Sequence, residues 1–175
     1  MSQFLLRPIG TIRTRYASFD DTPVQAALNV DEHAVIELDA SYVDGLEGLG
    51  EFSHAWLVTW LGSEQGDVVP EPALRQVPFL LQRTGQEVGI FAMRGPRRPN
   101  PIGLSLVRLV AVEPPRVTFA GVDMLDGTPL LDLKPYFRDA DTPIGDVHCG
   151  WYDSIDLGGP VTPRGLGGSA PSDST

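Results

Sequence analysis

The chain has 175 residues, of which 42% are hydrophobic, and this is enough for one globular domain with a buried core but not for two. Its 23 acidic residues outnumber its 13 basic residues and give a net charge of −10, which argues against a general attraction to nucleic acid or anionic membranes. The single cysteine, Cys149, excludes an intramolecular disulfide framework. The N-terminal segment lacks the features of a secretory signal and no apolar stretch is long enough to span a bilayer, so we expect a cytoplasmic protein.

Glycine and proline are frequent, with 19 and 16 residues, and they interrupt long helices because proline lacks a backbone donor and glycine loses much conformational entropy. We therefore expect short strands and loops, arranged as a barrel or a sandwich. β-Branched and aromatic residues between turn signals predict strands over residues 4–14, 34–38, 54–60, 88–93, 104–112, 117–120 and 130–133. Single helical turns are predicted over 42–49 and within 72–81.

The end of the chain differs in composition from the rest. From residue 156 it is rich in glycine, proline and serine and has few large apolar side chains. We therefore predict one domain over residues 1–155, followed by a mobile tail over 156–175.

The segment 94–105, RGPRRPNPIGLS, is the most informative stretch of the sequence. Two prolines bracket Asn100 and restrict its backbone, which suits a fixed hydrogen-bonding role for its amide. No acidic residue lies between Glu87 and Glu113, whereas four arginines do: Arg94, Arg97, Arg98 and Arg108. This group of four residues, the arginine cluster, can bind a carboxylate or a phosphate through bidentate guanidinium contacts. Alternatively, its arginines pair with the surplus carboxylates of the protein.

A second segment, 121–136, contains Asp126 and Gly127 at a strong turn signal. If Leu131 and Leu133 face the core of the strand that follows, Asp132 and Lys134 share its other face. A carboxylate or lysine there can position an acceptor or take up its proton, or it can belong to a solvated hairpin with a surface ion pair.

Other patterns narrow the chemistry. His54 precedes an aromatic strand, where it can act as a general base near neutral pH or simply hydrogen-bond locally. Three histidines and one cysteine at wide spacing do not form a zinc pattern, so no metal is predicted. The sequence has neither the strand–GxGxxG–helix dinucleotide fingerprint nor a GxxxxGK[ST] loop nor a GxSxG elbow, so any cofactor must bind to another scaffold.

Segments of the chain resemble the TsaA-like, or TrmO, family in order and spacing over about residues 5–155. They are PIGTIRTRY (8–16), residues 23–25, FSHAW (52–56), RGPRRPNPIGLS (94–105), GVDMLDGTPLLDLKPY (121–136), and Gly150 with Trp151. The resemblance implies a mainly β fold, a single-sheeted TsaA-like β-barrel with short helices and long loops. It also implies a methyltransferase that uses S-adenosylmethionine, is usually a homodimer, and methylates N6 of threonylcarbamoyladenosine beside the tRNA anticodon.

The resemblance also implies site residues. The S-adenosylmethionine contacts would fall at Pro23, Val24, Gln25, His54, Ala55, Arg94, Leu104, Leu125, Asp126, Gly127 and Thr128. The catalytic candidates on the acceptor side would be Asn100, Asp132, Lys134 and Tyr136. Arg97 and Arg98 are the candidates for contacts with substrate phosphates. Asp132 or Asp126, directly or through Tyr136, is the candidate acceptor for the proton of the methylated nitrogen.

Two alternative functions remain open. Longer family members carry a further domain after the barrel, and a net charge of −10 is unfavourable for binding a polyanion. A methyltransferase on the same scaffold that acts on a small molecule would meet neither difficulty. A noncatalytic sensor that binds S-adenosylmethionine and signals to a partner is the other alternative.

Overall fold

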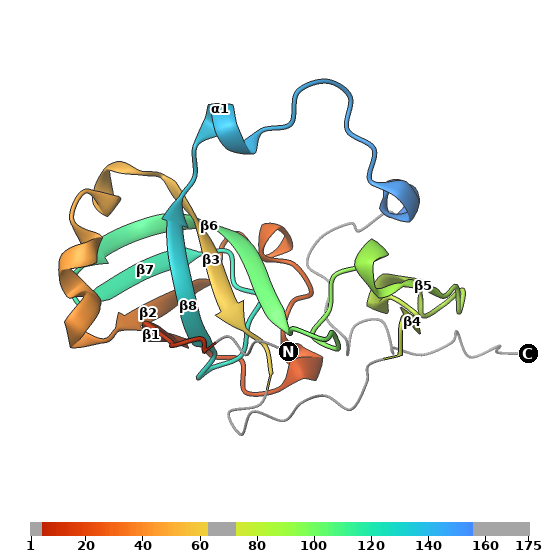
Figure 1. The fold of residues 1–175 in the computed structure, drawn as a ribbon, viewed down its shortest axis with the longest axis horizontal. Helices are drawn as coiled ribbons and strands as arrows, with labels where there is room; N and C mark the ends of the chain where they lie inside the picture. The colour runs from red at the N-terminus through yellow and green to blue at the C-terminus, as the bar shows by residue number, and fades with distance from the viewer. Residues whose placement is uncertain (1–4, 63–72, 156–175) are drawn as a thin grey trace, which may run out of the picture.

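The computed structural model describes residues 5–62 and 73–155. Six antiparallel strands form a closed barrel in the order β1-β2-β7-β6-β3-β8, and β8 pairs back with β1 (Figure 1). Their bounds are β1 Gly10–Arg13, β2 His33–Leu38, β3 His54–Trp60, β6 Ile102–Glu113, β7 Arg116–Ala120 and β8 Pro129–Pro135. Closure gives each strand a partner on both sides, which removes the exposed edges of an open sheet. The predicted single-sheeted barrel is confirmed.

Short elements surround the barrel. Strands β4 (Arg75–Gln76) and β5 (Val88–Gly89) pair with each other, and α1 (Arg138–Asp141) is a single turn of α-helix. The 3-10 turns are η1 Phe19–Asp21, η2 Ala26–Leu28, η3 Ala40–Leu46, η4 Leu49–Glu51, η5 Phe79–Leu81, η6 Ile90–Ala92 and η7 Gly150–Ser154. Across the two described ranges, no helix has the length and apolar character needed to cross a membrane.

The barrel core is built by alternation along the strands. In β3 the side chains of Ala55, Leu57 and Thr59 are buried, and the residues between them are only half-buried because they face outward. Every barrel strand contributes a buried apolar side chain to the interior: Ile12, Ile36, Leu57, Val107, Val117, Phe119 and Leu130. Burying one such side chain contributes about 1.5–3 kcal/mol, so the core holds the six strands together.

Most of the predicted strands are found in the structure. The prediction for 54–60 matches β3, and those for 34–38, 104–112, 117–120 and 130–133 agree with β2, β6, β7 and β8 to within two residues at each end. The prediction for 4–14 was too long, because β1 covers only residues 10–13. The helical turns predicted over 42–49 and within 72–81 correspond to η3 with η4 and to η5.

The strand predicted over 88–93 was wrong beyond residue 89. Its partner β4 is only two residues long, so the ladder ends at Gly89 and the chain continues as the 3-10 turn η6. Ile90 is buried, and its N–H donates to the Leu74 carbonyl at 3.0 Å. The tail predicted over 156–175 lies outside the described residues.

Gly10 sits at the seam where β1 closes the barrel. It pairs with Leu38 of β2 on one side and with Leu130 of β8 on the other. A Cβ atom at this position would lie 2.5 Å from the backbone oxygen of Glu37. Because the clash is with backbone, relieving it would require moving one strand away from the other.

We expect the substitution Gly10→Ala to lower the free energy of unfolding by about 1–3 kcal/mol, the range for overpacking a tight contact. Urea denaturation followed by circular dichroism measures this change. Gly45→Ala is the matched control, because no atom lies within 4 Å of a Cβ built there. Equal stabilities for the two variants would contradict the close packing at the seam.

Candidate functional site

Three segments that carry predicted cofactor contacts meet at the carboxylate of Asp123. The N–H of Ala26, directly after residues 23–25, donates to Asp123 Oδ2 at 2.9 Å. The hydroxyl of Ser105, the residue after Leu104 in β6, donates to Asp123 Oδ1 at 2.8 Å. Asp123 itself comes two residues before the 125–128 turn. The Asp123 carboxylate therefore sets the relative positions of all three segments. We call this carboxylate and its contacts with Ala26 and Ser105 the Asp123 junction.

Arg94 brings a fourth predicted segment to the same place. Its Nη1 donates to Oε1 of Gln25 at 2.9 Å, which ties the 94–105 loop to residues 23–25. Burial raises the pKa of Asp123 above its usual value, while the hydrogen bonds from Ser105 and Ala26 and the charge of Arg94 act in the opposite direction. The junction thus holds a carboxylate whose charge is poorly solvated and has a guanidinium close by.

The 125–128 turn is fixed by the chain that follows β1. The N–H of Thr14 donates to Asp126 Oδ1 at 3.1 Å, and the N–H of Asp126 donates to the Tyr16 carbonyl at 2.8 Å. Gly127 has a φ of 81°, a left-handed conformation that favours glycine. Asn29 at the end of η2 donates to both the Tyr16 hydroxyl and the Val122 carbonyl. The turn and η2, which packs beside β6, therefore belong to one hydrogen-bonded unit (Figure 1).

His54 and Ala55 lie away from the Asp123 junction. Ala55 is fully buried in the barrel, whereas His54 faces outward and its Nδ1 lies 2.9 Å from the hydroxyl oxygen of Ser53. In the β3–β6 register His54 pairs with Arg108, while Leu104 pairs with Val58. Four residues of strand correspond to about 13 Å, so His54 and Leu104 occupy different ends of the β3–β6 ladder.

The catalytic candidates of β8 lie on the outer face of the barrel. Asp132 pairs with Val58 and Lys134 with Trp56 in the β3–β8 register, and Lys134 Nζ lies 2.5 Å from Asp132 Oδ2. The predicted shared face of Asp132 and Lys134 is confirmed. The hydroxyl of Tyr136 lies 2.9 Å from Oγ1 of Thr142.

The core position expected for Leu131 is occupied by Leu130 instead. The register shifts between Val58 and Thr59, so Thr59 pairs with Leu130 and Leu131 becomes the extra residue of a β-bulge. Leu130 is fully buried and Leu131 is not. The bulge restores the alternation beyond it, which is why Leu133 still packs against the core.

Leu104 is a cofactor candidate that lies on the same outer face of the barrel as the catalytic candidates Asp132 and Lys134. Its side chain is 56% exposed on the outer face of β6, and the next residue, Ser105, points the opposite way to Asp123. Asp132, Val58 and Leu104 form one row across β8, β3 and β6. Two strand spacings separate the ends of this row, which places Asp132 about 10 Å from Leu104.

The arginine cluster consists of three arginines in the 94–105 loop and Arg108 in β6, and the charge of Arg94 acts on the Asp123 carboxylate. Within residues 5–62 and 73–155, none of its four arginines forms an ion pair, so the structure does not support the alternative in which they pair with surplus acids. Arg98 donates to the Met93 carbonyl at 2.8 Å, and the backbone oxygen of Arg97 accepts a hydrogen bond from Gln76 at 2.9 Å. Asn100 is exposed, and its backbone oxygen accepts a hydrogen bond from the N–H of Ile102.

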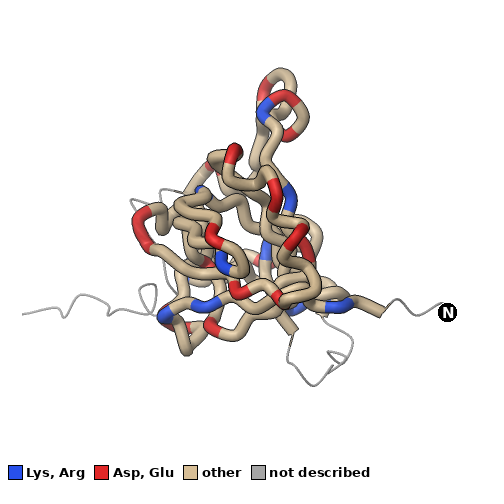
Figure 2. Tube along the Cα trace, turned by 90° about the vertical axis from the view of Figure 1, so that its left-hand side faces the viewer, with Lys and Arg blue, Asp and Glu red and all other residues tan. Residues whose placement is uncertain are grey.

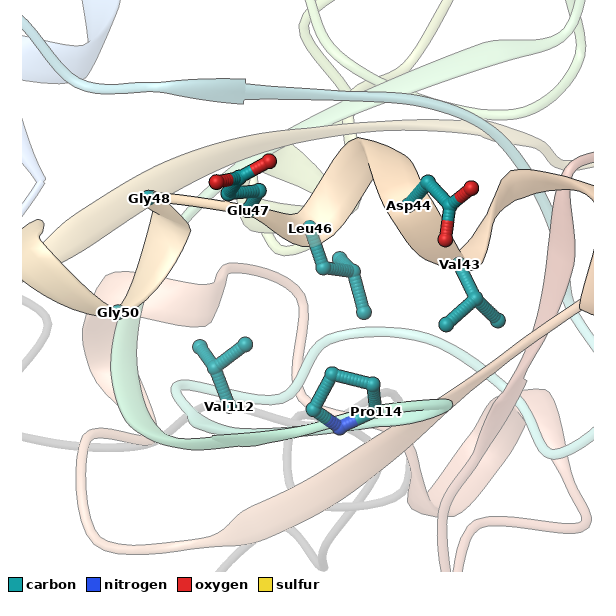
Figure 3. A pocket seen from close by; sticks show the side chains of 8 residues that line it. All are labelled: Val43, Asp44, Leu46, Glu47, Gly48, Gly50, Val112 and Pro114. Carbon is teal, nitrogen blue, oxygen red and sulfur yellow. The ribbon is translucent and has the colours of Figure 1, made fainter.

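Acidic residues are prominent elsewhere on the molecule. Figure 2 views the side of the barrel away from the β4–β5 hairpin and shows carboxylate-bearing residues spread over its loops. An open groove of about 570 Å³ lies at the far end of β6 from the 94–105 loop (Figure 3). It is lined by Val43, Asp44, Leu46, Glu47, Gly48, Gly50, Val112 and Pro114. It contains none of the predicted site residues.

The site residues predicted from the sequence do not include Asp123, Ser105 or Asn29. Asp123 and Ser105 lie inside the segments that carry the family resemblance, but neither residue type at that position signals a buried contact. A signal that could have found Asp123 is its place between the apolar residues Val122 and Met124, where a carboxylate needs partners. The partners themselves are distant in sequence.

Comparisons with known proteins agree with this architecture. A family model described as the tRNA-methyltransferase O N-terminal domain matches residues 11–142. A probable S-adenosyl-L-methionine-binding protein from Pyrococcus abyssi is 36% identical over 148 residues, which cover 84% of this chain and 75% of that protein. The tRNA (adenine(37)-N6)-methyltransferase of Mus musculus is 36% identical over 143 residues, covering 79% of this chain and 32% of the mouse protein.

A solved structure gives the same result. The crystal structure of TrmO from Pseudomonas aeruginosa superimposes with a TM-score of 0.69 at 33% identity, covering 89% of this chain and 65% of that one. The chain thus spans under two thirds of the solved TrmO chain. The barrel, its recognised segments and these matches together establish that the chain belongs to the TrmO family.

Proposed function

We propose that this protein is an S-adenosylmethionine-dependent methyltransferase that methylates N6 of threonylcarbamoyladenosine next to the anticodon of tRNA. Family membership supports this function, as do the names of a relative from Pyrococcus abyssi and of the mouse enzyme. The observation that carries the proposal is the Asp123 junction, because it gathers four of the segments assigned to the cofactor. Action on tRNA implies a cytoplasmic location.

The residues at the junction fit the chemistry of S-adenosylmethionine. The carboxylates of Asp123 and Asp126 suit its positively charged groups, and the guanidinium of Arg94 suits its carboxylate. Leu104, on the outer face of β6 and pointing away from Asp123, offers an exposed apolar surface for a purine ring at the border of this site. When bound, the cofactor supplies a methyl group that its sulfonium has already activated.

The chain's own residues then have to align the acceptor nitrogen and receive its proton. Alignment is the larger task, since methyl transfer is an in-line displacement that depends on orientation. The carboxylates of Asp126 and Asp132 are almost equally exposed, at 45% and 44%, and each accepts one backbone N–H. Asp132 is our candidate for the proton acceptor because it lies on the outer face with the other acceptor-side candidate Lys134, which orients it.

The outer face of β6 and β3 also suits a homodimer. Ile102 and Leu104 are 44% and 56% exposed there, and the indoles of Trp56 and Trp60 lie half-buried on the same face. A twofold interface must be self-complementary, and the outer face of the neighbouring β8 carries both an acidic and a basic side chain in Asp132 and Lys134. Such an interface would border the cofactor site at Leu104.

Methylation of bulk tRNA tests the proposed function. We expect the protein with S-adenosylmethionine to produce N6-methylated threonylcarbamoyladenosine from tRNA that carries the threonylcarbamoyl group, and none from tRNA that lacks it. Nucleoside mass spectrometry after digestion identifies the product. Cofactor binding without transfer to either tRNA would indicate the sensor or the small-molecule enzyme instead and would contradict the proposal.

The arginine cluster generates a second prediction. If Arg97 and Arg98 bind phosphates, replacing both by alanine should weaken binding of tRNA and reduce the dependence of log affinity on log salt by roughly one for each lost contact. Filter binding at several salt concentrations measures the slope.

The matched control removes two arginines that form ion pairs elsewhere, Arg116 with Glu37 and Arg138 with Asp139. It changes the net charge by the same amount. The same loss of slope in both double variants would mean that only overall charge matters and would refute a local phosphate site.

A further inference from the structure

An exposed aromatic ring lies beside the arginine cluster. Phe91, in η6, is 81% exposed, although Ile90 before it is almost fully buried. The buried neighbour anchors the turn, since the N–H of Ile90 also donates to the Leu74 carbonyl. Isolated exposed apolar side chains are common on proteins, so exposure by itself assigns no role to Phe91. The groups around the ring indicate a role.

A guanidinium lies over the ring. The Arg98 carbon Cζ is 5.9 Å from the centre of the Phe91 ring, within the range of a cation–π contact. The hydrogen bond from Arg98 Nη1 to the Met93 carbonyl holds the guanidinium in place. Two flat groups that can stack, one aromatic and one cationic, are therefore held next to each other at the surface.

The turn that carries Phe91 is fixed on a second side by η7. The indole N–H of Trp151 donates to the Ala92 carbonyl at 2.7 Å, which places η7 next to η6 (Figure 1). The ring of Tyr152 lies 5.9 Å from that of Trp151. Further aromatic surface thus lies close to Phe91, and the turn is attached at both ends.

The charge around this surface favours an anionic ligand. Residues 88–112 contain four arginines and no carboxylate, and the carboxylate of Asp153 in the neighbouring η7 accepts the N–H of Cys149. Unpaired bases of RNA stack on aromatic rings and on arginine planes, while their phosphates seek cations. A flat anionic ligand with repeated ring systems matches this surface better than an apolar peptide, which gains little from the arginines.

We propose that Phe91 and Arg98 form a stacking platform for one unpaired base of a single-stranded RNA loop, separate from the nucleotide that is methylated. This inference rests on the proposed function, because it identifies how the same enzyme would hold its RNA. Phe91 lies three residues before Arg94, which the hydrogen bond to Gln25 ties to the Asp123 junction.

Binding of an RNA hairpin with an unpaired loop, measured by fluorescence anisotropy, tests the platform. We expect Phe91→Ala to weaken the affinity about tenfold, a typical effect of losing one stacked base. Phe91→Trp should keep the affinity because it keeps a flat ring, and Phe91→Leu should be as weak as the alanine variant. A 2-aminopurine base in the loop should be quenched by the wild-type protein and less by Phe91→Leu.

Phe19→Ala is the matched control, because Phe19 is 53% exposed in η1 next to Asp20 and lies outside the arginine cluster. Its RNA affinity should equal that of the wild type. Equal melting temperatures show that each variant is folded. Wild-type affinity in Phe91→Ala or Phe91→Leu would overturn the platform while leaving the proposed function intact. A wild-type protein that binds neither the hairpin nor tRNA would overturn both.

Discussion

The carboxylate of Asp123 accepts hydrogen bonds from two parts of the chain, the N–H of Ala26 and the hydroxyl of Ser105. Withdrawing a carboxylate from water is costly, and these bonds, together with the charge of Arg94, offset part of that cost. The pKa of Asp123 remains raised by burial, so the offset is incomplete. The hydrogen bonds to the Asp123 carboxylate therefore hold η2, β6 and the 125–128 turn in one arrangement. The proposed cofactor site depends on this arrangement.

The barrel supplies the frame for this junction. Its closed ladder alternates buried and outward residues, so a continuous apolar core fixes where each outward side chain lies. Asp132 and Lys134 in β8 consequently face the same side as Leu104 in β6, and β3 lies between these two strands. The bulge at Leu131 preserves this arrangement, because without the extra residue the outward and inward positions of β8 would exchange. The sheet thus places Leu104 and the acceptor-side candidates of β8, whereas hydrogen bonds between loops hold the cofactor candidates Gln25, Arg94 and Asp126.

Features that depend on local pattern could be predicted from the sequence. The β-branched and aromatic residues from His54 to Trp60 predicted β3, and the lack of acidic residues between Glu87 and Glu113 marked the arginine cluster while leaving open whether its arginines pair with distant carboxylates. Features that depend on distant partners could not. The strand expected beyond Gly89 fails because its partner is short, and the bulge at Leu131 depends on the register of another strand. The Asp123 junction joins residues 97 and 18 positions apart, which leaves no local signal of the contact.

We propose that the Asp123 carboxylate organises the cofactor site and that the Asp132 carboxylate serves the acceptor side. Calorimetric titration with S-adenosylmethionine of the wild type, Asp123→Ala and Asp132→Ala tests it directly, because each variant loses one carboxylate and the change in net charge is the same. The account predicts that Asp123→Ala binds at least about tenfold more weakly, a loss of about 1.4 kcal/mol, and that Asp132→Ala binds like the wild type. Unchanged affinity in a folded Asp123→Ala variant, or an equal loss in both, would contradict it.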